Sequence, residues 1–209
     1  MMFWKELTAL GDASITLPAA IVIALLLLAP TTRGLALRWF VLFGAMLACV
    51  VATKLAFLAW GAGIAEINFT GISGHSSRSA AVWPALAFVL VWNSSKATRR
   101  NVVALSFVIA ALISASRVII DAHSLSEALL GFVLGSVVSM LFMQRAAAYQ
   151  PRPVGHPILA VGAVILVGSA LLGPAPTKTW MRELAFYLTD RDEPYSRNEL
   201  MQGTGGARQ

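Results

Sequence analysis

Long uncharged runs dominate the pattern of this chain. Seven of them follow one another between short polar stretches, at 13–32, 39–53, 55–65, 79–95, 101–116, 128–144 and 157–177. A helix that crosses a bilayer needs roughly 17–25 mostly apolar residues, because each residue adds about 1.5 Å. Charged side chains near helix ends are tolerated. The pattern therefore predicts six membrane-spanning helices, at about 14–31, 37–60, 78–95, 101–118, 124–144 and 155–174.

The composition agrees with a membrane protein. Of the 209 residues, 57% are hydrophobic and 12% are charged, whereas soluble domains carry about 25% charged residues. We expect an all-α polytopic bundle over 14–174, preceded by an outer-side segment 1–13 and followed by an outer-side polar tail 175–209. Apolar residues at helical spacing predict an interfacial helix at 177–190. Beyond Glu193 we expect disorder.

The net charge of +6 is explained by topology. Three alternate connections between the predicted spans carry basic residues and no acidic ones, which is the positive-inside pattern of cytoplasmic loops. The other two connections and both termini then lie on the outer side. The expected partners are bilayer lipids and a lipid-borne substrate, and a nucleic acid is not expected. The basic residues concerned are Arg33, Arg38, Lys96, Arg99, Arg100, Arg145 and Arg152.

Ionisable residues gather near the two outer connections. Such residues are costly at membrane depth and usually face a polar cavity, so the topology predicts one polar pocket at the outer membrane boundary. The eight residues are Lys54, Glu66, His75, Arg78, Arg117, Asp121, His123 and Glu127.

The spacing of His123 and Glu127 suggests catalytic chemistry. Four residues apart at the start of a predicted helix, they share one face. The carboxylate can accept the Nδ1–H of the imidazole and leave Nε2 as a directed lone pair. Arg117 adds a forked cation suited to phosphate. Alternatively, Arg117 forms only a structural ion pair with Glu127 or Asp121.

The stretch Ser73-Gly74-His75 opens the third predicted span. Free amides at a helix start bind anions, and glycine permits close approach of the backbone. Lys54, near the outer end of the second span, adds a cation to the same face. Alone, Lys54 is better explained as a lysine that extends its amine to the membrane surface.

Three motifs in 50–145 together resemble the type 2 phosphatidic acid phosphatase superfamily, which is related to vanadium haloperoxidases. Its pattern is Lys-x6-Arg-Pro, then Pro-Ser-Gly-His, then Ser-Arg-x5-His-x3-Asp. The third block is Ser116-Arg117-VIIDA-His123-SLS-Glu127, with glutamate in place of aspartate. The second is ISGH (72–75), which lacks the proline. The first is reduced to Lys54, since Gly61 and Ala62 replace Arg-Pro.

The resemblance implies a membrane phosphatase that hydrolyses a lipid phosphate or diphosphate at the outer face, without metal or cofactor. His123 would attack phosphorus and form a phosphohistidine, Glu127 would orient it, and His75 would protonate the leaving group. Arg78, one turn after His75, could replace the missing arginine. The implied phosphate-binding residues are Lys54, Ser73, Gly74 and Arg117. Arg78 is a further candidate, and its position alone is also explained by a plain charge at the outer face.

Two other functions are weighed against this one. His75, His123 and Glu127 could bind zinc, but the neighbouring Lys54 and Arg117 would repel a divalent cation. A non-enzymatic protein that binds or transports an anionic lipid would use the same pocket, although the chain lacks the internal repeats common in transporters. The sequence leaves the oligomeric state open. It also leaves open the choice among phosphatidate, phosphatidylglycerophosphate, polyprenyl diphosphate and lipid A phosphate.

Overall fold

A computed structural model describes residues 1–149, 156–171, 173–189 and 193–205 of the chain. Helices joined by short turns make up most of these residues, which confirms the all-α prediction. The elements are α1 (Met2–Ala9), α2 (Ala13–Leu26), α3 (Arg33–Trp60), the one-turn 3₁₀ helix η1 (Ala65–Ile67), α4 (Gly74–Leu90), α5 (Lys96–Ile119), α6 (Leu125–Ala146), α7 (His156–Leu171), α8 (Thr177–Leu188) and α9 (Arg197–Gly205).

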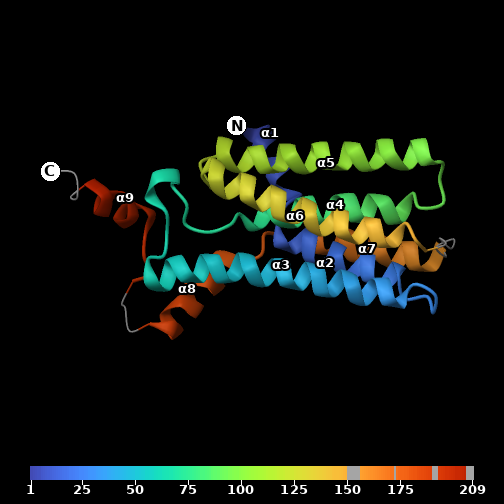
Figure 1. Ribbon diagram of the computed structural model, residues 1–209, viewed down its shortest axis with the longest axis horizontal. Coiled ribbons are helices and arrows are strands. Elements are labelled where there is room, and N and C mark those ends of the chain that lie inside the picture. The colour runs from blue at the N-terminus through green and yellow to red at the C-terminus, as the bar shows by residue number, and fades with distance from the viewer. Residues whose placement is uncertain (150–155, 172, 190–192, 206–209) are drawn as a thin grey trace.

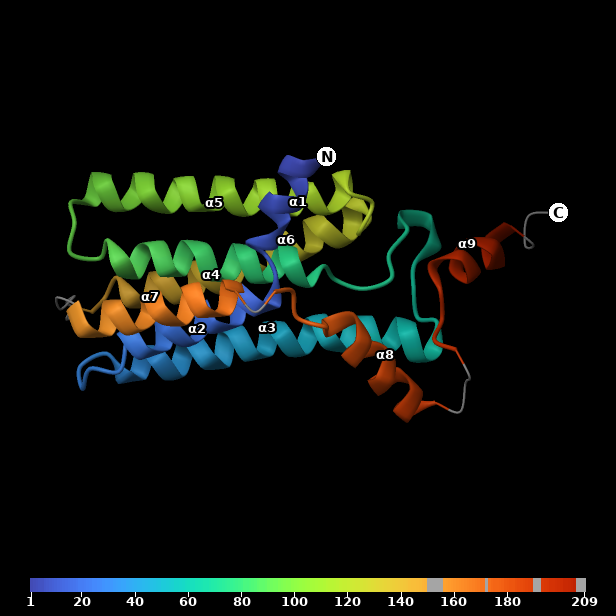
Figure 2. The same ribbon diagram turned by 180° about the vertical axis from the view of Figure 1, so that it is seen from behind.

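Helices α2 to α7 lie side by side in an elongated bundle (Figures 1 and 2). One end of the bundle holds the α2–α3 and α4–α5 turns, the end of α6 and the start of α7. The opposite end holds the α3–α4 and α5–α6 connections, and α8 and α9 extend from that same end. The basic residues attributed to cytoplasmic loops therefore lie at one end, apart from Arg152, which is outside the described residues.

Four helical stretches are long and apolar enough to cross a membrane: Met2–Leu26, Arg33–Trp60, Lys96–Ile119 and Leu125–Ala146. The other two predicted spans correspond to α4, with 17 residues, and α7, with 16. At about 1.5 Å per residue these are about 25 Å long. The structure supports a helical membrane protein, and the count of six spans stays a prediction.

The contact between α4 and α6 positions the site. Gly131 and Gly135 face α4: a Cβ on Gly131 would lie 2.6 Å from the carbonyl oxygen of Ser73, and one on Gly135 would overlap the carbonyl of Ser77. Glycines four apart let two helices meet backbone to backbone, as in other membrane bundles. The start of α4 is thereby fixed against the first turns of α6.

The tail differs from its prediction. Helix α8 falls within the expected 177–190, but α9 forms beyond Glu193, where disorder was expected. Ser196 and Glu199 cap α9 reciprocally: the Ser196 backbone N–H donates to Glu199 Oε2 at 2.6 Å, and the Glu199 N–H donates to Ser196 Oγ at 3.3 Å. The backbone N–H of Tyr195 also donates to the carbonyl of Leu58 at 2.9 Å. A local cap and a tertiary contact thus order this segment.

Candidate active site

His123 lies in the connection between α5 and α6. Asp121 adopts a left-handed conformation (φ 53°) after α5 ends, and the backbone N–H of His123 donates to the carbonyl of Arg117 at 3.1 Å. The ring Nδ1 of His123 is 2.6 Å from Oε2 of Glu127. When Nδ1–H donates to the carboxylate, Nε2 keeps a lone pair for a substrate.

Glu127 serves the helix as well as the histidine. It stands at the third position of α6, where its N–H donates to Ser124 Oγ and its Oε2 accepts from the Ser124 N–H, both at 3.3 Å. The same oxygen contacts His123. Glutamate reaches both partners from this position, which gives a physical reason for glutamate where the family pattern has aspartate.

The carboxylate of Glu127 is fully buried, and its negative charge is stabilised by further donors besides His123. Thr70 donates to Oε1 from its backbone N–H at 2.7 Å and from its hydroxyl at 2.6 Å. Nη2 of Arg197, in α9, lies 2.9 Å from each carboxylate oxygen. Neither Thr70 nor Arg197 is predicted from the sequence.

Ser73 caps α4 rather than facing the cavity described below. Its hydroxyl accepts from the Ser76 N–H at 3.4 Å, and its backbone N–H donates to the carbonyl of Glu127 at 3.1 Å. The second motif is therefore tied to the third. Ser73 is fully buried, so direct phosphate binding by its hydroxyl stays a prediction.

Arg78 is buried behind the start of α4, with 7% of its surface exposed. Its Nε donates to Thr16 Oγ1 at 3.0 Å and its Nη2 to the carbonyl of Gly11 at 3.2 Å. Nη1 lies against Gly74, where an added Cβ would be 2.7 Å away. Glycine at position 74 thus lets the guanidinium reach the first turn of α4.

Arg117 has an unused donor. Its Nη1 donates to Thr8 Oγ1 at 2.9 Å, so the guanidinium bonds α1 rather than Glu127 or Asp121. Its Nε is buried and has no hydrogen-bond partner in the described part of the chain. An unsatisfied buried donor costs about 1–3 kcal/mol, and an anion beside it would remove that cost.

His75 has a carboxylate partner from the N-terminal region. Its Nε2 lies 3.5 Å from Oδ2 of Asp12. Asp12 also caps α2 by accepting from the Ser14 N–H, and it accepts from the Ala175 N–H, both at 2.9 Å. The sequence marks Asp12 as a helix cap before an apolar run, but its proximity to His75 has no sequence signal.

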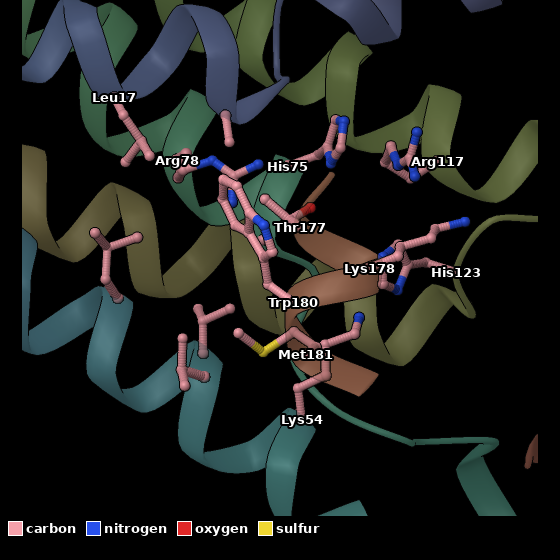
Figure 3. Close-up of a pocket in the computed structure, with 15 residues that line it drawn as sticks. Leu17, Lys54, His75, Arg78, Arg117, His123, Thr177, Lys178, Trp180 and Met181 are labelled. Atoms are coloured by element: carbon pink, nitrogen blue, oxygen red, sulfur yellow. The ribbon is translucent and has the colours of Figure 1, made fainter. Parts of the chain in front are cut away.

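These side chains surround a cavity of about 250 Å³. Figure 3 shows the labelled lining residues on helices α2, α3, α4, α5 and α8 and on the α5–α6 connection. Its polar part combines four cations with both histidines: Lys54, Gly74, His75, Arg78, Arg117, His123, Thr177 and Lys178. Its apolar part is Ala13, Leu17, Leu47, Val50, Val51, Trp180 and Met181. The cavity can accept an anionic group joined to a hydrocarbon.

A second cavity, of about 580 Å³, lies on another side of His123. Its wall includes Glu66, Asp121, Ser124 and Arg197. Glu66 and Asp121, expected in the one polar pocket, therefore line a separate space. His123 is on the wall of both cavities.

Burial sets the protonation of His123. Loss of water around the imidazolium lowers the pKa of His123 below its ordinary value. The bond to Glu127 opposes this shift, and the nearby cations Lys54 and Arg117 add to it. The net direction of the shift favours the neutral form of the ring.

The geometry gives no support to a zinc site. Within the described ranges, no three side chains among His, Cys, Asp and Glu come together as a metal-ligand group. This includes the set His75, His123 and Glu127.

Most of the predicted site residues meet at the first cavity. The residues that line it are Lys54, Gly74, His75, Arg78, Arg117 and His123. Glu127 is bonded to His123, and Ser73 caps the helix that carries His75. Asp12, Thr70, Lys178 and Arg197 are close to the site in the fold but are not predicted from the sequence. Lys178 and Arg197 belong to the polar tail, where nothing in their local sequence points to the site.

Comparisons with known proteins agree with the motifs. Residues 53–151 match the family model of the PAP2 superfamily, a segment that contains Lys54, both cavity histidines and Glu127. The chain is 37% identical over 204 residues to a Klebsiella pneumoniae protein described as an uncharacterized 22.5 kDa protein in cps region, covering 95% of this chain and 98% of that one. No solved structure matches. This family match confirms the resemblance seen in the three motifs. The chain belongs to the PAP2 superfamily.

Proposed function

We propose that the protein is an integral membrane phosphatase that hydrolyses a lipid phosphate or diphosphate at the outer membrane face, through a phosphohistidine on His123 and without a metal ion. PAP2 membership and the apolar helices fit a membrane phosphatase. One observation carries the finer proposal. His123, held by Glu127 at 2.6 Å, lies on the wall of a cavity that gathers four cations.

The cavity suits a phosphoryl group. Phosphoryl transfer depends mainly on positioning and on neutralising charge at the phosphoryl oxygens. Lys54 and Arg117 supply cations, and the unpaired Nε of Arg117 supplies a donor. Gly74 and His75 begin α4 and line the same space, where the amides of a first helical turn can bind an anion. Arg78 lies against Gly74 and adds a further cation to the cavity.

In the first step, the Nε2 lone pair of His123 attacks phosphorus and forms an N–P bond. The bond between phosphorus and the leaving oxygen breaks, and that oxygen takes its electron pair and a proton from His75. Burial lowers the pKa of His75 to about 4, and Asp12, 3.5 Å away, opposes this shift and so favours the protonated ring that the transfer needs. Glu127 stabilises the positive charge that develops on His123.

In the second step, water attacks phosphorus and gives a proton to the now neutral His75. The N–P bond breaks, its electron pair returns to His123, and phosphate is released. His75 thus acts first as an acid and then as a base, and both histidines end in their starting states.

Two features support a lipid substrate on the outer side. Apolar residues from α2, α3 and α8 line the cavity together with the cations, which provides a surface for a hydrocarbon chain. The cavity lies near the end of the bundle opposite the basic turns, and the positive-inside rule assigns basic turns to the cytoplasm.

His123→Ala tests the proposal. Detergent-purified protein is given radiolabelled phosphatidate, phosphatidylglycerophosphate, polyprenyl diphosphate or lipid A phosphate, and both phosphate release and acid-quenched phosphoprotein are measured. We expect the wild type to hydrolyse at least one lipid and to carry label on His123. The variant should lose both signals, with activity reduced at least about 10³-fold.

His156→Ala is the matched control, because His156 begins α7 at the other end of the bundle and should leave activity unchanged. Turnover retained in His123→Ala would contradict the nucleophile assignment. Binding of all four lipids without phosphate release by the wild type would favour the non-enzymatic function.

A further inference from the structure

Arg197 connects the C-terminal tail to the catalytic pair. Besides its two 2.9 Å contacts with Glu127, its Nη2 donates to Thr70 Oγ1 at 3.1 Å. Its Nη1 donates to the carbonyl of Asn68 at 3.1 Å and to its side-chain oxygen at 2.6 Å. Both terminal nitrogens of the guanidinium are therefore used to hold Glu127 and the segment before α4.

The tail docks on the end of α3 through two glycines. Gly61 ends α3 in the left-handed region (φ 69°), and a Cβ there would lie 3.0 Å from the ring of Tyr195. A Cβ on Gly63 would lie 2.9 Å from Cδ2 of Leu200. Residues on both sides of Arg197 thus fit against positions that only glycine leaves open.

Gly61 is also the position where the family pattern has arginine, seven residues after Lys54. An arginine there would be strained at this φ, and its Cβ would lie in tight contact with the ring of Tyr195. The docked tail and an arginine at position 61 therefore compete for the same space. The tail brings a different arginine to the site, from the other end of the sequence.

We propose that Arg197 is a positioning residue that holds Glu127, and through it His123. In this site the first motif has Gly61 in place of the family arginine, and the tail packs against that glycine. The inference rests on the proposed phosphatase function. It assigns Arg197 to the carboxylate rather than to the substrate, because Arg197 does not line the cavity that holds the cations.

The charges around His123 decide in which direction its titration should shift when Arg197 is removed. His123 shares the first cavity with Lys54, His75, Arg78, Arg117 and Lys178, and the second cavity with Glu66, Asp121 and Arg197. Arg197 bonds the carboxylate of Glu127, which in turn holds the ring of His123. Without Arg197, the negative charge of Glu127 is less neutralised and stabilises the imidazolium more strongly. His123 should then protonate at a higher pH than in the wild type.

The test compares Arg197→Met and Arg197→Lys with the wild type. NMR of labelled histidine in full-length, detergent-purified protein follows the titration of His123, assigned with His123→Ala. We expect a higher midpoint in Arg197→Met and an intermediate one in Arg197→Lys. With the panel lipid that is hydrolysed fastest, kcat should fall about 10- to 100-fold in Arg197→Met, with KM little changed. Partial recovery of kcat is expected in Arg197→Lys.

Two comparisons separate positioning from general stability. Arg182→Met removes an exposed tail arginine and should change neither the midpoint nor kcat. In the double variant, Arg197→Met should not lower kcat below that of Glu127→Gln alone, because the carboxylate through which Arg197 acts is already gone.

An unchanged midpoint and kcat in Arg197→Met would overturn the inference. A raised KM with unchanged kcat would also overturn it, since that result marks a phosphate ligand. A wild type that releases no phosphate overturns the phosphatase proposal instead, and the NMR comparison still tests Arg197.

Discussion

The site contains two histidine–carboxylate pairs that differ in almost every respect. His123 and Glu127 are one helical turn apart, 2.6 Å from each other, and the carboxylate is fully buried. His75 and Asp12 come from distant parts of the chain and are 3.5 Å apart, with 18% and 14% of their side chains exposed. The first pair is tight and local, and the second is loose and tertiary.

This difference matches the proposed roles. A nucleophile has to keep one ring orientation, so a buried carboxylate with several further donors suits it. An acid–base group has to exchange its proton with a leaving group and then with water. A more distant, partly exposed carboxylate leaves the ring of His75 the freedom to do so.

Removing the charge from the tight pair should have the largest effect. In Glu127→Gln the amide no longer stabilises the imidazolium, and we expect kcat for phosphate release to fall on the order of 10³-fold or more. Glu66→Gln, an exposed carboxylate on the second cavity, is the control and should keep wild-type kcat. A Glu127→Gln variant within tenfold of wild type would contradict the orienting role.

Removing the charge from the pair His75 and Asp12 should lower kcat less. A hydrogen bond to a charged group contributes about 1.5–3 kcal/mol, so Asp12→Asn should lower kcat about 10- to 100-fold. Single-turnover kinetics should show slower formation of the phosphoenzyme, the step in which His75 gives up its proton. Asp121→Asn, at an exposed position, serves as control. Equal losses in Asp12→Asn and Glu127→Gln would show that the two pairs do not differ in the way described.

The smallest effect should come from changing the spacing between the pairs. A Cβ in Gly131→Ala meets the carbonyl of Ser73 at 2.6 Å and pushes α4, which carries His75, away from α6. Such overpacking costs about 1–3 kcal/mol, seen as earlier thermal unfolding in detergent, with kcat reduced several-fold. Gly44→Ala, where an added Cβ meets nothing within 4 Å, should be at least as stable as the wild type. Equal behaviour of the two variants would argue against a backbone contact at Gly131.

Local signals made much of the fold and site predictable. Uncharged runs locate the bundle helices to within a few residues at most ends, because burial in a membrane requires them. His123 and Glu127 are readable as a pair because their contact is set by helix geometry alone. Gly74 and His75 are readable because they stand at a helix start.

The parts that the sequence analysis misses depend on tertiary contacts. Asp12 is a recognisable helix cap, but only the packing of α2 against α4 brings it to His75. Arg197 lies in a polar tail whose composition resembles disorder. The Ser196-to-Glu199 capping box is a local sign of α9, yet no local pattern indicates that the tail docks at Gly61 and Gly63 and reaches Glu127.

The position of Arg197 after every apolar helix of the described chain has a consequence for biosynthesis. A ribosome makes Lys54, both cavity histidines and Glu127 before it makes the tail, so these residues enter the membrane while one partner of the carboxylate is missing. Arg197 can reach Glu127 only once the tail is on the same side of the membrane as His123. On the proposed outer-face topology, translocation of the tail is therefore the step that completes the proposed active site, and a chain whose tail is retained on the other side would be inserted but impaired.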